Sequence, residues 1–337
     1  MEIFGSTFDD SVFSEVRDRV CESLTSYNPK MCEAEWFCES VALETDDPIE
    51  TQKVYKFRGD LALRKGNYQQ ALEAYSSCLQ WIADNNLTIR RDVLEGMARC
   101  CTRLGQRDRA LDLVDLLSKE ASNTCHLTSL LLLKVSIHQH FGAVRSEISC
   151  LQQLCSLLPF NPWHWLSLGQ VCLQLLDSNP VPGKHSPHYF SDGLFCVVIL
   201  SCNLFAAVEG LHAEIEEEEE LHKDWIWLKA CISLIRTRLL LRILRQQQSS
   251  FVLHRSEKTL EITEEALQRL NPKEKSLQAL TEVMSEDLIP EKMREDFQDG
   301  ESLSSVCLQS FRERWWSKVL LACAGDQNGE QKATVLQ

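Results

Sequence analysis

The sequence predicts an all-α protein: a solenoid of tandem helical hairpins followed by a C-terminal helical region. Two observations support this prediction. Only 13 glycines and nine prolines interrupt a chain of 337 residues that is rich in helix-favouring side chains. A hairpin pattern also recurs, with 39 residues between the turn glycines Gly66 and Gly105. A repeat of this length is typical of stacked helical units.

Composition divides the chain into five segments. We expect an acidic, partly irregular segment at 1–50, the repeats at 51–176, a loop with an apolar and an acidic run at 177–220, C-terminal helices at 221–325 and a flexible tail at 326–337. The apolar run, residues 193–208, has 16 residues. Because a spanning helix needs roughly 20 residues, we interpret this run as a buried element and expect no membrane span.

The bulk composition also excludes some functions. A formal net charge of −14 argues against nucleic acid as the main partner, because phosphate binding needs a basic surface. The 15 cysteines include no C-x-x-C pair, which disfavours a zinc site and favours buried, reduced thiols. The N-terminus has no secretory signal pattern. We therefore expect a cytoplasmic or nuclear protein without a cofactor.

Each hairpin is predicted from small residues and a turn. In the first, Gly59 and Ala71 let two helices approach closely around a turn at residues 65–67, with tyrosines beside them. A second copy has Gly105 in its turn, and a looser third copy turns at Gly142.

A fourth hairpin is expected to begin at Pro162, with Asn161 as its N-cap. Phe160 and Trp165 have the spacing of a hydrophobic staple across the first turn. Trp163 lies two positions from Trp165 and is expected to point to the opposite side of the helix.

These units resemble tetratricopeptide (TPR) repeats over residues 51–176. The resemblance is carried by Gly59, Gly66, Tyr68, Ala71 and Tyr75 in the first hairpin, and by Pro159, Trp165, Leu168 and Gly169 at the fourth. The third hairpin departs from the pattern, because Glu147 stands where that family has alanine. The whole chain also resembles a vertebrate family named for a human chromosome-8 open reading frame, through "CEAEWF", "FNPWHW" and "CISLIRTRLLLRIL". That family implies a fold and no activity.

The TPR resemblance implies which residues line the inner face of the solenoid, because in that family they come from fixed positions of each first helix. Carried over to this sequence, the candidate peptide-binding residues are Lys53, Lys56, Phe57, Arg64, Arg99, Arg103, Leu132, Leu133 and Trp163. Basic side chains with apolar anchors suit an extended or helical peptide that carries acidic and bulky residues. The alternative is an ordinary solvated face.

The C-terminal region is expected to form several helices, one of which starts with Asn271 as its N-cap and Pro272 in its first turn. A candidate second interface in this region consists of Arg238, Arg242, Arg245, Trp315 and Trp316. The arginines follow one side of a predicted helix and form either a solvated stripe or a dock for an acidic segment. Adjacent tryptophans in a helix are not expected to face inward together, so one of them either marks an interface or covers the edge of the core.

The sequence contains no G-x-S-x-G, H-E-x-x-H, P-loop or G-x-G-x-x-G motif. We therefore predict a non-enzymatic scaffold or adaptor that binds a protein partner on the inner face. One alternative is a stoichiometric subunit of a larger complex, in contact through its C-terminal helices. The alternative from another class is an enzyme or metal protein that uses cysteine or histidine. Acidic segments at residues 33–37 and 216–220 are candidates for docking on basic surfaces of the same chain.

Overall fold

The computed structural model describes residues 33–178, 223–246, 250–289, 293 and 308–322. Over these residues the chain is helical and contains no strand, so the all-α prediction is confirmed. None of the helices in these ranges combines the length and the hydropathy that crossing a bilayer requires. The expectations for the apolar run at 193–208, the acidic run at 216–220 and the tail at 326–337 lie outside the described residues.

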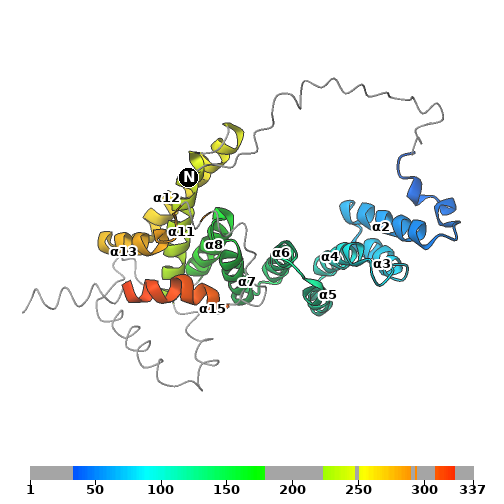
Figure 1. Cartoon of the computed structure of the whole chain (residues 1–337), viewed down its shortest axis with the longest axis horizontal. Coiled ribbons are helices and arrows are strands. Elements are labelled where there is room, and N and C mark those ends of the chain that lie inside the picture. The colour runs from blue at the N-terminus through cyan, green and yellow to red at the C-terminus, as the bar shows by residue number, and fades with distance from the viewer. Residues whose placement is uncertain (1–32, 179–222, 247–249, 290–292, 294–307, 323–337) are drawn as a thin grey trace, which may run out of the picture.

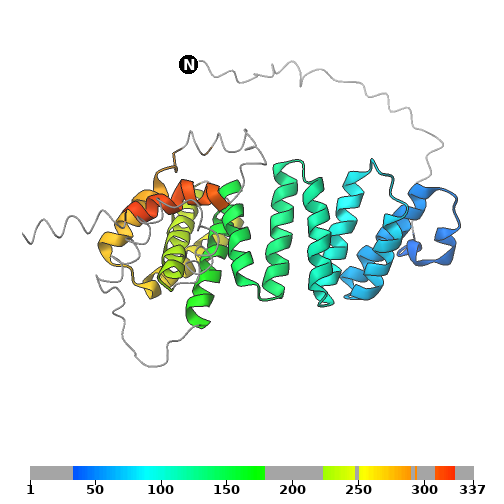
Figure 2. The ribbon, with the colours of Figure 1, turned by 90° about the horizontal axis from the view of Figure 1, so that it is seen from below.

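The N-terminal part is a row of helices that lie side by side (Figures 1 and 2). They are α2 (Pro48–Arg64), α3 (Tyr68–Leu79), α4 (Leu87–Arg103), α5 (Arg107–Glu120), α6 (Thr124–His140), α7 (Val144–Leu157) and α8 (Pro162–Ser178). Helices α2 and α3, α4 and α5, and α6 and α7 pack as three hairpins. The predicted turn glycines Gly66, Gly105 and Gly142 have φ values of 78°, 75° and 66°, a conformation that glycine adopts without strain.

The first helix of each unit begins at an Asp or Asn whose side chain accepts a backbone N–H of the first turn. These caps are Asp47 to Ile49 N at 2.9 Å, Asn86 to Ile89 N at 3.5 Å, Asn123 to His126 N at 2.9 Å and Asn161 to Trp163 N at 3.0 Å. The caps satisfy amide groups that have no partner inside the helix. The predicted cap at Asn161 is therefore confirmed.

Helix α11 (Lys223–Arg245) packs against α8. The two helices approach closely at Gly169, where an added Cβ would lie 3.1 Å from a methyl group of Leu234. Helix α12 (Ser250–Leu270) packs on α11, and Trp227 Nε1 near the start of α11 donates to Leu270 O at the end of α12. The two helices are therefore antiparallel.

Helix α13 (Glu274–Ser285) follows a short connection, and its N-cap is Lys273. The predicted helix start at Asn271 and Pro272 is wrong. Asn271 adopts φ 48°, and its N–H donates to Leu267 O, which closes the end of α12. Asparagine is one of the residues that tolerate this left-handed conformation, and so it ends one helix where we expected it to begin the next.

The last described helix consists of α15 (Leu308–Phe311), a π-helical turn η4 (Arg312–Trp316) and a continuation to residue 322. It lies against α7 and covers the C-terminal helices (Figure 1). The buried apolar residues form two clusters. The first extends from Ala62 to Ile137, the second runs from Leu131 to Val319, and α6 contributes to both.

Candidate functional site

Helices α2, α4 and α6 present equivalent residues on one exposed side. The offsets are 39 residues from Gly66 to Gly105 and 37 residues from Gly105 to Gly142. The equivalent positions are exposed or half-buried in all three helices, and their spacing of three, four and four residues keeps them on one side. We call this surface the first-helix face. It consists of Lys53, Lys56, Asp60 and Arg64 on α2, Asp92, Glu95, Arg99 and Arg103 on α4, and Ser129, Leu132, Ser136 and His140 on α6.

Several basic side chains on the first-helix face are paired within their own helix. Lys56 Nζ lies 3.0 Å from an Asp60 carboxylate oxygen, and an Arg99 guanidinium nitrogen lies 2.6 Å from Glu95 Oε1. Lys53 pairs with Glu50 at 2.7 Å, and this hydrogen bond raises the pKa of Lys53. The pairs of Lys53 and Arg99 are exposed and exchange partners at little cost, so they do not prevent the face from binding an acidic group, whereas the Lys56–Asp60 pair is half-buried.

The ends of the three helices carry a row of basic groups. Arg64, Arg103 and His140 occupy the same position, two residues before each turn glycine, and all three are exposed. Arg64 and Arg103 form no hydrogen bond or ion pair with any described residue. We call these three residues the basic edge. Cations at helix C-termini also stabilise the helices through the helix dipole.

Phe57 is partly covered by the N-terminal segment, of which η1 (Trp36–Cys38) is a short 3₁₀ helix. The ring centroids of Phe37 and Trp36 lie 5.5 and 6.4 Å from that of Phe57. Arg58 Nε donates to Phe37 O at 2.6 Å, and Lys65 Nζ lies 3.2 Å from Glu35 Oε1. Residues 33–37, one of the two acidic segments that we expected to dock within the chain, thus contact α2.

The two leucines predicted as apolar anchors have different environments. Leu132 is 45% exposed and lies on the first-helix face, but Leu133 is 2% exposed and belongs to the core. Leu133 is therefore not available to a ligand, and this prediction is wrong. The reason is that α6 is apolar on both sides, because it lies between the two hydrophobic clusters. A run of four leucines gives no indication of which one faces solvent.

Trp163 is half-buried and lies at the end of the row of helices, where α12 reaches α8. The Arg255 guanidinium lies over its ring, 4.4 Å from the centroid, which is a cation–π contact. Trp165 is fully buried, and its Nε1 donates to Pro159 O at 2.9 Å. Trp163 thus points away from the core as predicted, but a C-terminal helix covers part of it.

The basic stripe on α11 docks within the chain. Arg242 pairs with Glu264 at 2.6 Å and Arg245 with Glu257 at 3.5 Å, both on α12. Arg238 lies within 3.5 Å of Thr281 Oγ1 on α13, and burial lowers its pKa. The acidic partner of the stripe is therefore α12; the run at 216–220 lies outside the described residues.

Trp315 and Trp316 are both buried, so the expectation that only one faces inward is wrong. The Trp315 ring lies 4.9 Å from that of Trp165 on α8, and the Trp316 ring lies 5.2 Å from that of Trp225 on α11. The two residues lie in a π-helical turn, which is wider than an α-helical turn and brings neighbouring side chains closer in direction. The last helix also packs against both α8 and α11, so Trp315 and Trp316 can each point toward a different helix and still be buried.

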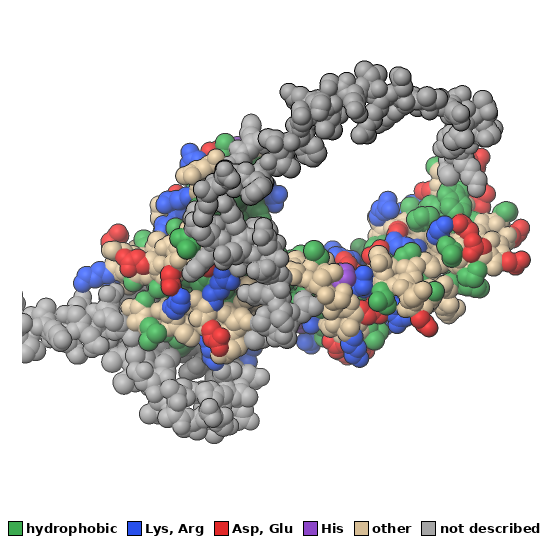
Figure 3. Space-filling model, in the orientation of Figure 1, with side chains coloured by type: hydrophobic (Ala, Val, Ile, Leu, Met, Phe, Trp, Pro, Cys, Tyr) green, Lys and Arg blue, Asp and Glu red, His purple; other side chains and the backbone are tan. Residues whose placement is uncertain are grey.

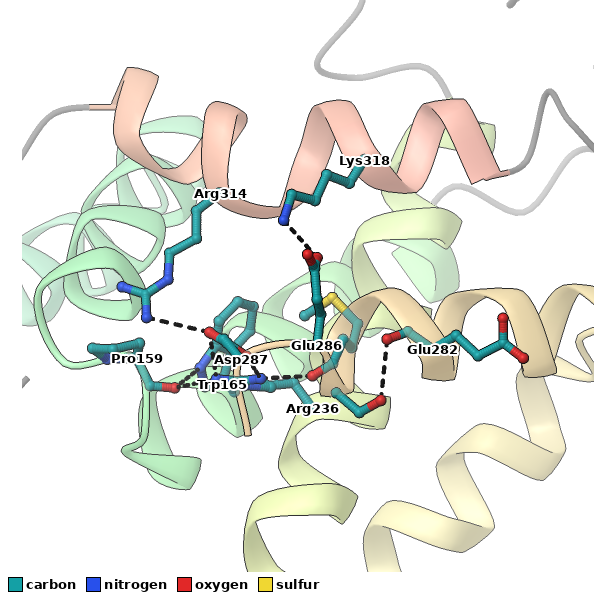
Figure 4. A network of polar contacts seen from close by, with 10 residues as sticks. Pro159, Trp165, Arg236, Glu282, Glu286, Asp287, Arg314 and Lys318 are labelled. Carbon is teal, nitrogen blue, oxygen red and sulfur yellow. Dashed lines mark hydrogen bonds and ion pairs between the residues drawn. The ribbon is translucent and has the colours of Figure 1, made fainter. Parts of the chain in front are cut away.

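Sequence reasoning missed the buried cluster around Arg236 of α11, which Figure 4 shows. Arg236 is fully buried and donates to both carboxylate oxygens of Asp287 and to Met284 O at 2.6 Å. Arg314 of the last helix lies 3.2 Å from Asp287 Oδ2. The rings of Phe160 and Trp165 lie 5.5 and 5.9 Å from the Arg236 guanidinium. The sequence does carry a signal, because Arg236 falls four residues after Ile232, on the apolar side of its helix.

The buried cysteines behave as apolar residues. Seven of the nine described cysteines are buried, and none of the nine is in a disulfide. Burial raises the pKa of Cys172 to about 12 and that of Cys78 to about 11, so these thiols stay protonated at neutral pH. Within the described ranges, no three His, Cys, Asp or Glu side chains are grouped so that they could hold a metal ion.

The structure thus defines an all-α protein of packed helical hairpins with a basic edge and a buried arginine cluster. The chain belongs to a family of unknown function (DUF5588), whose model matches residues 2–188 and 195–319. It is 34% identical to the human "Uncharacterized protein C8orf76" over 94% of this chain and 93% of the human protein. It is 31% identical to the rat "Uncharacterized protein C8orf76 homolog", with the same coverage. The whole-chain resemblance to the family named for a human chromosome-8 open reading frame is confirmed.

Proposed function

We propose that the protein is a non-enzymatic adaptor that binds a segment of a partner protein on the first-helix face. The observation that carries the proposal is the basic edge. Arg64, Arg103 and His140 recur at one position of successive helices, and the two arginines have no described partner. Evenly spaced donors on neighbouring helices suit a ligand that crosses the helices. The resemblance to TPR repeats supports the same choice of face.

The partner segment is expected to be acidic, with at least one bulky apolar residue. Charge complementarity with the basic edge favours carboxylates, and Leu132 supplies an exposed apolar contact beside it. The free buried thiols support a reducing compartment, the cytoplasm or the nucleus.

The test is affinity purification of the full chain with quantification of co-purified proteins. Arg64→Glu with Arg103→Glu reverses the basic edge, and Lys119→Glu with Arg145→Glu makes the same charge change on the exposed sides of α5 and α7. We expect the first variant to lose a defined set of partners at least tenfold and the control to retain it. If both variants retain the same proteins as the wild type, the first-helix face is not the binding surface.

A permanent contact through the C-terminal helices is the second candidate. Because Trp315 and Trp316 are buried, the contact would use α12 instead, where Val252 and Ile262 are 40% and 48% exposed. These residues lie on the same side of α12 as Arg255. Raising the salt concentration separates the two candidates, since screening weakens a charged contact far more than an apolar one.

A further inference from the structure

A further surface lies at the N-terminal end of the row of helices, around Phe57 of α2. One helix position faces the preceding hairpin in each repeat. Gly96 of α4 lies against Tyr75 of α3, where an added Cβ would be 2.8 Å from the ring. The equivalent residue of α6 is Leu133, which is buried in the core. The equivalent residue of α2 is Phe57, and among the described residues, which begin at Glu33, no hairpin precedes it.

The described residues cover Phe57 only in part. Trp36 and Phe37 of η1 contact its ring, yet Phe57 remains 39% exposed. Val41 of η2 (Ser40–Leu43), which also contacts α2, is 64% exposed. Hydrophobic side chains accordingly gather at the α2 end of the molecule (Figure 3). We call Trp36, Phe37, Val41 and Phe57 the apolar end, and its side chains occupy the place that a further helix would take.

The sequence just before the apolar end has the pattern of such a helix. Phe13, Val16, Val20 and Leu24 follow one another at intervals of three, four and four residues, with mostly charged and polar residues between them. This spacing places the four side chains on one side of an α-helix. The family model matches from residue 2, so this segment belongs to the sequence that the family shares.

The segment can also reach the apolar end. The described chain begins at Glu33, two residues before the contact of Glu35 with Lys65 on α2. The nine peptide steps from Leu24 to Glu33 span at most about 30 Å when fully extended. An intramolecular partner so close in sequence has a high effective concentration, which favours it over a free peptide.

We propose that residues 11–24 bind the apolar end as an amphipathic helix and so cap the row of helices. Phe13, Val16, Val20 and Leu24 cover Phe57, Trp36 and Val41, while the acidic and basic side chains of the segment face solvent. Repeat arrays need a terminal unit with a polar outer side, because an uncovered end exposes the surface that normally packs against a neighbour. The proposal does not depend on the proposed function, because it rests on the exposed apolar side chains of the apolar end and not on the basic edge.

Hydrogen exchange of the full chain, followed by mass spectrometry, tests this docking. Val16→Glu with Val20→Glu places charge on the apolar side of the segment. The matched control, Ser11→Glu with Ser14→Glu, adds the same charge on its polar side. We expect the first variant to exchange at least tenfold faster in residues 11–24 and in the amides of α2 that face η1. The control should match the wild type, and α7 and α8 should be unchanged in both as a reference for folding.

Two outcomes would overturn the proposal. In the first, residues 11–24 of the wild type exchange as fast as an unfolded peptide, and both variants leave α2 unchanged. In the second, the protection of α2 appears only as protein concentration rises and sedimentation shows a dimer. That result would assign the apolar end to a second copy of the chain.

Discussion

At the residue scale, one side chain joins three helices of the first two hairpins. The Tyr75 ring of α3 lies between Gly59 of α2 and Gly96 of α4, where a Cβ would come within 2.5 and 2.8 Å of it. Its hydroxyl donates to Asp60 Oδ1 at 2.8 Å, and burial together with this bond raises the pKa of Tyr75. Asp60 on the first-helix face is thus hydrogen-bonded to a buried side chain of the core.

Glu147 of α7 is a carboxylic acid at a position that is buried in all three hairpins. Its equivalents in the first two hairpins are Ala71 and Ala110, both fully buried, and Glu147 itself is 5% exposed. Burial raises the pKa of its carboxyl group. The departure from the repeat pattern that the sequence showed is therefore also a departure in packing, because a group that prefers water occupies a core position.

We expect Glu147→Ala to stabilise the protein at pH 7.5 by on the order of 1 kcal/mol, because the variant buries no carboxylate. A carboxyl group whose pKa is raised in the folded state favours folding when protonated, so wild-type stability falls as pH rises from the ordinary value through the raised pKa. The gain should therefore shrink towards pH 4.5. Urea unfolding at both pH values measures it, with Glu147→Gln as the isosteric control. A loss of stability at pH 7.5 would contradict the argument.

At the element scale, the last helix holds the C-terminal half together. Its Trp315 and Trp316 pack against α8 and α11, and its Arg314 contacts the same Asp287 that pairs with Arg236. Asp287 follows α13, so α11, α13 and the last helix meet around one carboxylate (Figure 4). Breaking a buried pair costs more than forming it gains, because the remaining charge keeps its desolvation penalty.

We expect Asp287→Asn to lower the free energy of unfolding by about 3 kcal/mol, since it leaves Arg236 buried without its counter-charge. The neighbouring change Glu286→Gln is the matched control. Glu286 pairs with Lys318, but both side chains are exposed, so its loss should cost less than about 1 kcal/mol. Chemical unfolding measures both values, and limited proteolysis near residues 308–322 reports release of the last helix. Equal effects of the two substitutions would show that the buried pair has no special role.

At the scale of the whole molecule, sequence patterns within single helices and turns predicted most of the helices. The features that these patterns did not predict depend on contacts between residues far apart in the sequence. The turn glycines and the cap at Asn161 act through neighbours in sequence, and the structure confirms them. Leu133 could not be placed, because α6 is apolar on both sides. The contact of Trp163 with Arg255 joins residues 92 positions apart, and the pairing of Arg236 with Asp287 joins residues 51 apart. The hydrophobic periodicity of a single helix does not indicate which distant residue will contact it.

The two hydrophobic clusters meet at α6, and they differ in how many sides of their helices are covered. Within the described part of the chain, helices α2 and α3 have a neighbouring hairpin on one side only. Helix α7 packs against α6, α8 and the last helix, and α8 packs against α11. In a repeat array each unit is stabilised mainly by its neighbours. We therefore expect the end of the row to have the lowest local stability, and α11, whose buried residues include Ile232 and Ile235, to have the highest.

We therefore expect the molecule to open from its N-terminal end. In native-state hydrogen exchange, α2 and α3 should open at least tenfold more often than α8 and α11, a difference of about 1.4 kcal/mol. Asp287→Asn should reduce the protection of α8, α11 and α13 while α2 and α3 keep theirs, because the substitution acts within the second cluster. The contrary result is that every helix of the wild type opens with the same free energy and that this value falls uniformly in the variant. The two hydrophobic clusters would then unfold as one cooperative unit, and α6 would not separate two regions of different stability.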